Sequence, residues 1–250
     1  MNLFENFRIA LRALAANKLR SGLTMLGIII GVAAVVALMS VGKGATSGIT
    51  EQVESLGTNL ITVSSARMFG AARGGDEQTL YMSDYEAIQD KVGQRAEIAP
   101  YYSSSATVIY ASRQSSYTIT GVTPSYAVVS EYTLTRGRFI TNSDNTGKAR
   151  VAVIGATTAT DLFAGFNPVG RDIKINGVTY EVVGVLESKG SLGMSSDDTI
   201  LIPLETGYSR LFMGLATRGG VQRLSGLILS AYSADDVDSI MQEVEFVLRR

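Results

Sequence analysis

A run of 21 residues without a charged side chain, Ser21 to Val41, constrains this chain more than any other feature of its sequence. As a helix with a rise of about 1.5 Å per residue, the run would be roughly 30 Å long, the thickness of a bilayer's hydrocarbon core. A helix pairs its backbone polar groups internally, as any segment inside a bilayer must. The run therefore predicts a transmembrane helix.

Two other interpretations of this run are weaker. A cleaved signal peptide has an apolar region of about 7–15 residues before a small-residue cleavage site. Here the apolar run is longer, and a leader of 20 residues precedes it. The second alternative is the buried core helix of a soluble protein, but 21 uncharged residues exceed what most such helices contain.

The basic residues before the run predict its orientation. The first 20 residues contain one acidic side chain and four basic ones, Arg8, Arg12, Lys18 and Arg20. Because the more basic flank of a membrane helix stays in the cytoplasm, we expect residues 1–20 there, residues 21–41 in the cell (inner) membrane, and residues 42–250 outside the cytoplasm. Apolar residues of the leader, Phe4, Phe7, Leu11 and Leu14, recur at helical spacing and predict an amphipathic helix on the inner membrane surface.

Within the predicted span, Gly27 and Gly31 form a GxxxG pattern. Small residues four apart let a second membrane helix approach closely. We expect this face to pack against another helix, with exposure to lipid as the equal alternative.

The composition argues against several classes of function. The chain has no Cys and no His, which removes thiol nucleophiles, cysteine zinc sites and the usual Ser-His-Asp machinery. Basic and acidic side chains are balanced at 22 against 23, so no charge excess favours nucleic acid as a partner. We expect no catalysis, no cofactor and no metal site. Four strand tyrosines are read as half-buried residues rather than a stacking surface: Tyr101, Tyr102, Tyr110 and Tyr117.

The rest of the chain predicts an α+β domain. Alternating or short apolar runs predict strands at 59–64, 106–110, 116–120, 151–155, 173–175, 178–185 and 199–204. The Asn176-Gly177 pair between two of these runs is a strong hairpin signal. A capping box from Ser83 to Glu86 begins one helix, small residues after Gly155 form another, and Ser233 caps a final amphipathic helix.

Three segments lack this regularity. Residues 42–48 are rich in glycine and predict a loose junction after the membrane helix. Residues 65–79 and 187–198 concentrate Gly, Ser and charged residues and predict mobile loops. In such loops, contact with a substrate or partner is about as plausible as a passive connection.

Three stretches of the sequence resemble the permeases of MacB-type (FtsX-like) ABC transporters. They are LTMLGIIIGVAAVVALMSVGKGA (residues 23–45), GVTPSYAVVSEYTLTRGRFIT (residues 121–141) and NPVGRDIKINGVTYEVVGVL (residues 167–186). The preceding NKLRSGLT (residues 17–24) also fits. The resemblance runs over essentially the whole chain, and the order and spacing of the motifs make it specific.

The resemblance implies a first membrane span followed by an extracytoplasmic core domain with two lobes, one porter-like and one β-rich lobe inserted into it. It implies a homodimer, a separate or fused ABC ATPase and, in many members, a membrane-fusion or adaptor protein. The implied activity is ATP-driven expulsion of a substrate through movements of the outer domains. No catalytic residue is carried over, and the Asn167-Pro168-Val169-Gly170 segment matches only as a turn that shapes the fold.

The chain ends at Arg250, where members of this family enter a second span. We therefore expect a truncated or partial permease. Two alternatives to an exporter remain: a non-transporting permease that regulates cell-wall hydrolases, and a single-span anchored binding protein. Sequence beyond residue 250 that contains three further spans would exclude the anchored binding protein.

Overall fold

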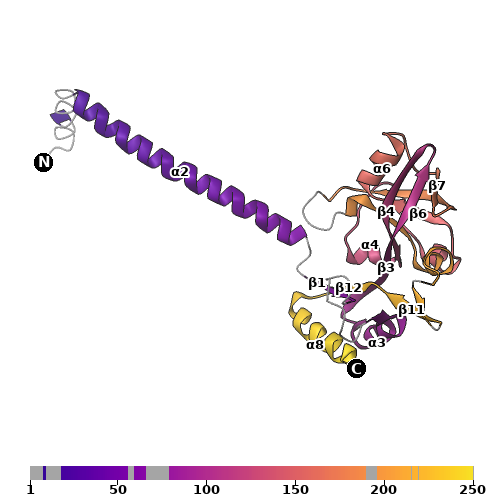
Figure 1. Cartoon of the computed structure of the whole chain (residues 1–250). Helices are drawn as coiled ribbons and strands as arrows, with labels where there is room; N and C mark the ends of the chain where they lie inside the picture. Colours follow the sequence, from indigo (N-terminus) through magenta and orange to yellow (C-terminus); the bar gives the residue numbers. More distant parts are fainter. Residues whose placement is uncertain are drawn as a thin grey trace, which may run out of the picture. The chain divides into compact units, whose positions relative to one another are not determined.

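The computed structural model describes residues 8–9, 18–55, 59–65, 79–189, 196–214, 216–218 and 220–249. The chain forms two compact units, Met1–Gly57 and Thr58–Arg250. The first unit is dominated by a single long helix, and the second contains a mixed α/β domain (Figure 1).

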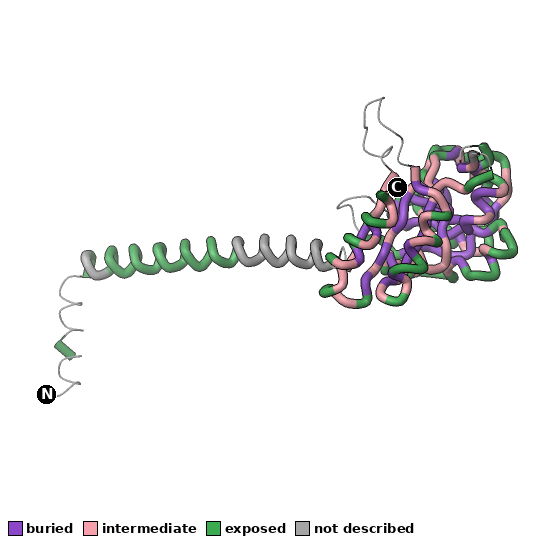
Figure 2. The backbone as a smooth tube through the Cα atoms, turned by 90° about the horizontal axis from the view of Figure 1, so that it is seen from below, coloured by how far each residue is buried: buried purple, intermediate pink, exposed green. Residues whose placement is uncertain are grey.

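The long helix is α2 (Lys18–Ser55). Its segment Gly22–Ser40 is apolar enough to cross a membrane, with a mean hydropathy of 2.5, and its side chains are exposed along the whole segment (Figure 2). The helix continues through residues 42–48, so the prediction of a loose junction there is wrong. Glycine weakens a helix but keeps the backbone N–H that the helical hydrogen bond needs, and no proline interrupts this stretch.

The second unit contains twelve strands among its described residues. They are β1 (Leu60–Ser64), β2 (Leu80–Tyr81), β3 (Ala96–Tyr110), β4 (Arg113–Val122), β5 (Leu134–Gly137), β6 (Val151–Ile154), β7 (Asp172–Ile175), β8 (Val178–Leu186), β9 (Thr199–Pro203), β10 (Thr217–Arg218), β11 (Val221–Leu224) and β12 (Gly226–Ala231). The helices are α3 (Met82–Val92), α4 (Ser125–Val129), α5 (Asn142–Thr146), α6 (Ala156–Phe163), α7 (Leu204–Thr206) and α8 (Val237–Leu248), with short helical turns η2 (Ser196–Asp198), η3 (Gly207–Leu211) and η4 (Ala234–Asp236).

Nine of these strands form one sheet in the order β1-β12-β3-β4-β9-β6-β8-β5, with β7 paired to both β3 and β8. Strand β3 is long enough to join two regions. Its first residues pair with β12 up to Tyr101, and from Tyr101 onward it pairs with β4. Helices α3 and α8 pack together beside the β1 and β12 end, whereas α6 lies over β8 at the other end (Figure 1). The α+β class is confirmed. The division into two lobes stays a prediction, because Thr58–Arg250 is one compact unit and a single sheet joins its two ends.

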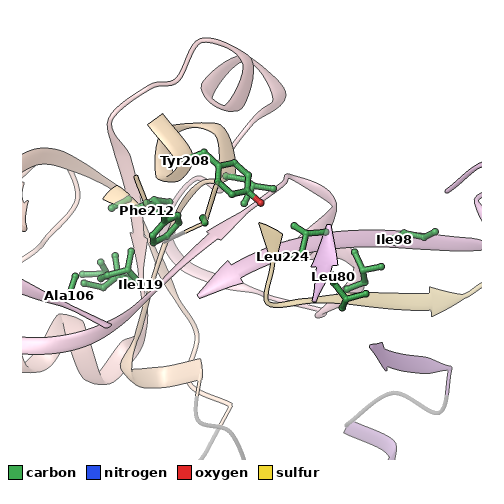
Figure 3. Close-up of a cluster of buried hydrophobic side chains, with 14 of the residues drawn as sticks. Leu80, Ile98, Ala106, Ile119, Tyr208, Phe212 and Leu224 are labelled. Carbon is green, nitrogen blue, oxygen red and sulfur yellow. The ribbon is translucent and has the colours of Figure 1, made fainter. Parts of the chain in front are cut away.

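Both faces of this sheet are buried in its central part. Alternate residues of β6 enter different apolar clusters: Ala152 and Ile154 join the larger one, and Val151 and Val153 the smaller one. A strand covered on both faces reads as a continuous apolar run, which is why β6 shows no polar alternation. The larger cluster extends from Ile119 and Phe212 to Leu80 and Leu224, which are paired across β2 and β11 (Figure 3).

The hairpin of β7 and β8 is confirmed. Asn176 and Gly177 both have positive φ angles, 46° and 85°, as the tight two-residue turn requires. Strand β9 is confirmed as well, and the final helix buries Ile240 and Val244 as expected. Ser233 caps the turn before α8, accepting a hydrogen bond from the Asp235 backbone amide at 3.3 Å.

Two local predictions are wrong in detail. Helix α3 begins one residue before Ser83, because Tyr81 ends β2 in an extended conformation and occupies the capping position. The carboxylate three residues later is then that of Asp84, which accepts the Tyr81 amide at 2.9 Å. The predicted strands at 106–110 and 116–120 are too short, because pairing continues up to the turn at Ala111 and Ser112 and β4 begins at Arg113.

Candidate functional site

The glycines of the predicted packing face lie on the exposed part of α2. Gly27 and Gly31 are four residues apart and therefore on the same side of the helix. Apart from the neighbouring backbone of the same helix, no described atom lies within 4 Å of where a Cβ would stand on either residue. The face is open to a second helix, and its use for packing stays a prediction.

The residues that predict orientation are only partly described. Arg8 lies in a short exposed helical stretch, and Lys18 is the first residue of α2 and exposed. Arg20 lies two residues further along the same helix, and Arg12 lies outside the described residues. So does the predicted amphipathic leader, apart from residues 8–9. Lys18 and Arg20 thus lie just before the apolar segment that starts at Gly22.

The strand tyrosines contribute to packing. The ring of Tyr102 lies 4.8 Å from that of Phe212, and the ring of Tyr110 lies 4.1 Å from that of Phe163, both measured between centroids. Tyr101 is 8% exposed. Three of the four rings are therefore buried or stacked within the domain, and they do not form an open platform for planar ligands.

An ion pair forms at Gly137-Arg138-Phe139, near the end of the stretch 121–141 that resembles the permease family. Arg138 donates to both carboxylate oxygens of Asp144, with Nη1···Oδ2 at 2.6 Å and Nη2···Oδ1 at 3.2 Å. The backbone amide and the hydroxyl of Thr141 donate to the same Oδ2 at 2.9 and 2.7 Å. Burial raises the pKa of Asp144, but the hydrogen bonds from Arg138 and Thr141 outweigh it and lower the pKa to about 2. Arg138 therefore stabilises the fold by joining the end of β5 to the start of α5 through Asp144.

The Asn-Pro motif forms a turn that is attached to the sheet. The side chain of Asn167 accepts from the Val169 amide at 3.3 Å, and the Gly170 amide donates to the Val182 carbonyl of β8 at 2.8 Å. Gly170 has a φ of 81°, which favours glycine. The predicted role in shaping the fold agrees with this geometry. The turn also fixes the next residue, Arg171, whose Nε donates to the Asn167 carbonyl at 2.9 Å.

Two surface hollows lie on either side of the β3–β4 hairpin and α6. The first has a volume of about 290 Å³ and is lined by Tyr110, Ala111, Ser112, Arg113, Leu162, Phe163, Ala164, Phe166 and Arg171. The second has a volume of about 300 Å³ and is mostly polar, lined by Ser115, Ser116, Tyr117, Thr118, Thr157, Asp161 and Asp198. Sequence reasoning missed both, because each is formed by segments that are distant in the chain.

Among the described residues, no group of three or more acidic side chains lies close enough together to hold a metal ion. The expected absence of catalysis stays a prediction. Glu181 is an exposed residue on the solvent-facing side of β8.

The predicted loops lie largely outside the described residues, which omit 66–78 and 190–195. Asp197 links the two described ends of the predicted loop 187–198 through hydrogen bonds. Its carboxylate accepts from the Ser188 hydroxyl at 2.6 Å and from the Lys189 amide at 3.2 Å. The Lys189 ammonium also donates to the Ser130 carbonyl at 2.7 Å. The base of this loop is thus closed by hydrogen bonds.

Comparisons with known proteins agree on one family. A family model described as the MacB-like periplasmic core domain matches residues 21–246. The "macrolide export ATP-binding/permease protein MacB" of Bdellovibrio bacteriovorus is 37% identical over 214 residues, which cover 84% of this chain and 33% of that protein. The protein of the same name from Rhodospirillum rubrum is 34% identical and covers 98% of this chain and 37% of its own length. The chain thus spans about a third of the curated relatives it matches.

Solved structures support the fold. The periplasmic region of MacB from Actinobacillus actinomycetemcomitans aligns with a TM-score of 0.64 at 20% identity, covering 80% of this chain and 89% of that one. The extracellular domain of the noncanonic ABC-type transporter YknZ from Gram-positive bacteria aligns with a TM-score of 0.57 at 21% identity, covering 76% and 90%. At these identities the likeness concerns the fold alone.

Proposed function

Because the chain belongs to the MacB-like periplasmic core domain family, we propose that it is the first span and outer domain of the permease of a MacB-type ABC exporter. It is a membrane protein with an extracytoplasmic domain. Its membrane helix has its N-terminal end in the cytoplasm, so the four basic residues before the span lie on the inner side. The outer domain follows the helix and takes part in expelling a substrate.

The main observation behind this proposal is the length of the chain that the family model matches. The match starts at residue 21, one residue before the apolar segment Gly22–Ser40, and runs to residue 246 near the end of α8. The match therefore includes the membrane helix and the folded domain in one unit. An unrelated anchor attached to a similar domain would not be expected to match over the helix as well.

The proposed mechanism needs partners that this chain does not contain. An ABC ATPase subunit hydrolyses ATP in the cytoplasm, and its movement reaches the outer domain through the membrane helices. The permease works as a homodimer, in which the face of Gly27 and Gly31 packs against another helix. A membrane-fusion or adaptor protein receives the substrate outside the cytoplasm. The lipid bilayer surrounds the span, and nucleic acid has no role.

A second function is supported by the same family resemblance. FtsX-like permeases share the architecture but signal to cell-wall hydrolases instead of transporting. The outer domain would then be a binding module whose shape changes on ATP hydrolysis. A single-span anchored binding protein is the third candidate.

Deletion of the gene that encodes the whole permease separates these functions. For an exporter, the deletion strain should become more sensitive to at least one compound in a panel of antibiotics and antimicrobial peptides. The whole gene should restore resistance, while the same gene without residues 58–249 should fail to do so although its product reaches the membrane. Normal sensitivity combined with chained or filamentous cells would instead establish the signalling function.

Orientation is tested in the same strain with single cysteines, since the chain has none of its own. A cysteine replacing Ser112 on the outer domain should react with a membrane-impermeant maleimide in intact spheroplasts. A cysteine replacing Lys18 should react only after the membrane is opened. The reverse pattern would overturn the orientation.

A further inference from the structure

The first hollow has an apolar floor between two parts of the chain. On one side is the β3–β4 turn with Tyr110, and on the other the end of α6 with Leu162 and Phe163. The Tyr110 and Phe163 rings pack at 4.1 Å between centroids and form the wall that joins these parts. Phe166 also lines the hollow, yet 70% of its surface is exposed. A large aromatic side chain is costly to leave in water, so this residue favours an apolar ligand.

Two guanidinium groups line the same hollow, and both are held in place. Arg171 donates from Nη1 to the Tyr110 hydroxyl at 2.8 Å and from Nε to the Asn167 carbonyl at 2.9 Å. Arg113 donates from Nη1 to the backbone carbonyl of Asp161. Each arginine thus uses only part of its fork of N–H donors on the described residues. The remaining donors are positioned in advance, so a ligand would not have to order two long side chains.

The charge of the hollow is unbalanced. Its lining contains two arginines and no acidic residue. Arg113 bonds to the main chain of Asp161, whereas the Asp161 side chain lines the other, polar hollow. Neither arginine forms an ion pair among the described residues. A guanidinium binds a carboxylate or a phosphate through two parallel hydrogen bonds, and the carboxylate is the smaller of these two anions.

The size of the hollow limits what it can accept. At about 290 Å³ it lies at the small end of the range for ligand pockets. A single residue with an apolar side chain and a carboxylate would fit this volume. Its side chain would pack on the apolar floor, and its carboxylate would accept hydrogen bonds from both arginines. The last residue of a polypeptide has this combination, and capture of a C-terminal carboxylate is a known mode of peptide recognition.

We propose that this hollow binds the C-terminal residue of a partner polypeptide, a large apolar residue whose free carboxylate is held by Arg113 and Arg171. The site does not depend on transport, because neither its geometry nor its charge involves the membrane helix. The turn that carries Arg171 then has a second role beyond shaping the fold.

Binding can be measured with a fluorescent reporter, because the chain contains no Trp. Phe166→Trp places a single indole at the hollow in the full chain in detergent micelles. The probe is the peptide acetyl-Gly-Ser-Gly-Leu with a free carboxylate, and its C-terminal amide is the matched control. We expect a saturable change in Trp emission with the acid and about tenfold weaker binding of the amide.

Arginine variants assign the binding to the two guanidiniums. In the reporter background, Arg113→Gln and Arg171→Gln should each weaken binding of the acid by about tenfold. Arg136→Gln removes an exposed arginine from β5, outside the hollow, and should leave binding unchanged. Circular dichroism of each variant shows whether the fold is intact. If Arg171→Gln loosens the turn, Arg113→Gln and the amide peptide still decide the outcome.

Three results would overturn the proposal. The first is equal binding of acid and amide, or no saturable change up to millimolar peptide. The second is equal weakening by Arg136→Gln, which would indicate a nonspecific charge effect. The third is tighter binding of octanoate than of the peptide, which would assign the hollow to an anionic lipid chain instead of a polypeptide end.

Discussion

Arg138 and Asp144 form a two-point ion pair, and the same Asp144 carboxylate caps α5 through Thr141. One side chain thereby links the strand end at Gly137 to the start of a helix. Asp144 is 8% exposed, so removing its carboxylate would take this acceptor from the Thr141 amide and leave Arg138 with its hydrogen bond to the Phe139 carbonyl.

This ion pair predicts a pH-dependent stability. The folded pKa of Asp144 is about 2, below its ordinary 3.8, so its contribution is complete above about pH 4 and is lost as the pH falls toward 2. Because Arg138 is half exposed, we expect Asp144→Asn to cost about 1–2 kcal/mol at pH 7. Urea unfolding at several pH values measures the loss. Asp161→Asn, which changes an exposed carboxylate, should cost little, and a loss for Asp144→Asn that is equal at pH 7 and pH 2 would contradict the assignment.

Two glycines with similar backbone angles should differ in their tolerance of alanine. Gly137 and Gly177 have φ angles of 79° and 85°. A Cβ on Gly137 would stand 2.1 Å from the Val183 carbonyl oxygen, whereas a Cβ on Gly177 would meet nothing within 4 Å. Gly177→Ala should cost about 1 kcal/mol from the backbone angle alone. Gly137→Ala should cost about 3 kcal/mol or more, because the main chain must also move. Thermal unfolding compares the two, and equal losses would show that the space around Gly137 is not limiting.

Tyr180 carries a buried hydroxyl with no hydrogen-bond partner among the described residues. Replacing it with Phe removes a desolvated polar group while keeping the ring, so Tyr180→Phe should stabilise the fold by about 1 kcal/mol. Tyr208 provides the matched control, since its hydroxyl donates to the Arg223 carbonyl at 2.7 Å. Tyr208→Phe should destabilise by about 1 kcal/mol or more. Denaturant titration of both variants measures the difference, and a loss of stability in Tyr180→Phe would show that its hydroxyl is satisfied by bound water.

The membrane helix gives a prediction for the whole permease. Replacing Gly27 and Gly31 together with Ile should reduce disulfide crosslinking between cysteines placed along this face, because the larger side chains prevent close approach of a second helix. Ile28→Leu, beside this face, and Ile29→Leu, on the opposite side of the helix, are the matched control and should leave crosslinking unchanged. Unaltered crosslinking in the double glycine variant would mean that Gly27 and Gly31 face lipid.

The sequence predicted correctly those elements whose conformation depends on residues close together in the chain. The apolar run of α2, the Asn176-Gly177 turn and the apolar face of α8 each depend on neighbouring residues alone. Strand β12 was not predicted, although Leu227 and Leu229 are fully buried. Its place comes from pairing with β1 and β3, which lie far away in the sequence.

The two surface hollows could not be predicted either, because their linings come from segments that are distant in the sequence. Arg113 and Arg171 lie in separate parts of the chain, and each reads by itself as an ordinary surface charge. Both arginines line the same hollow because β3 pairs with both β4, which begins at Arg113, and β7, which follows Arg171. The order of the strands in the sheet is therefore what brings the two residues together. The motif residues Asn167 to Gly170 could have suggested a rigid turn, but they do not show what the next residue faces.

The pairing of β1 with β12 also determines when the domain can finish folding. Asn59, just before β1, donates to the Ala231 carbonyl at the end of β12, 172 residues further along the chain. The first strand therefore has no partner in the sheet until residues 226–231 have emerged on the same side of the membrane. A chain with such distant pairings folds slowly, and its unpaired strand edge is open to aggregation in the interval. Translocation of this domain should accordingly depend on periplasmic or cell-surface chaperones more than that of a helical domain of equal length.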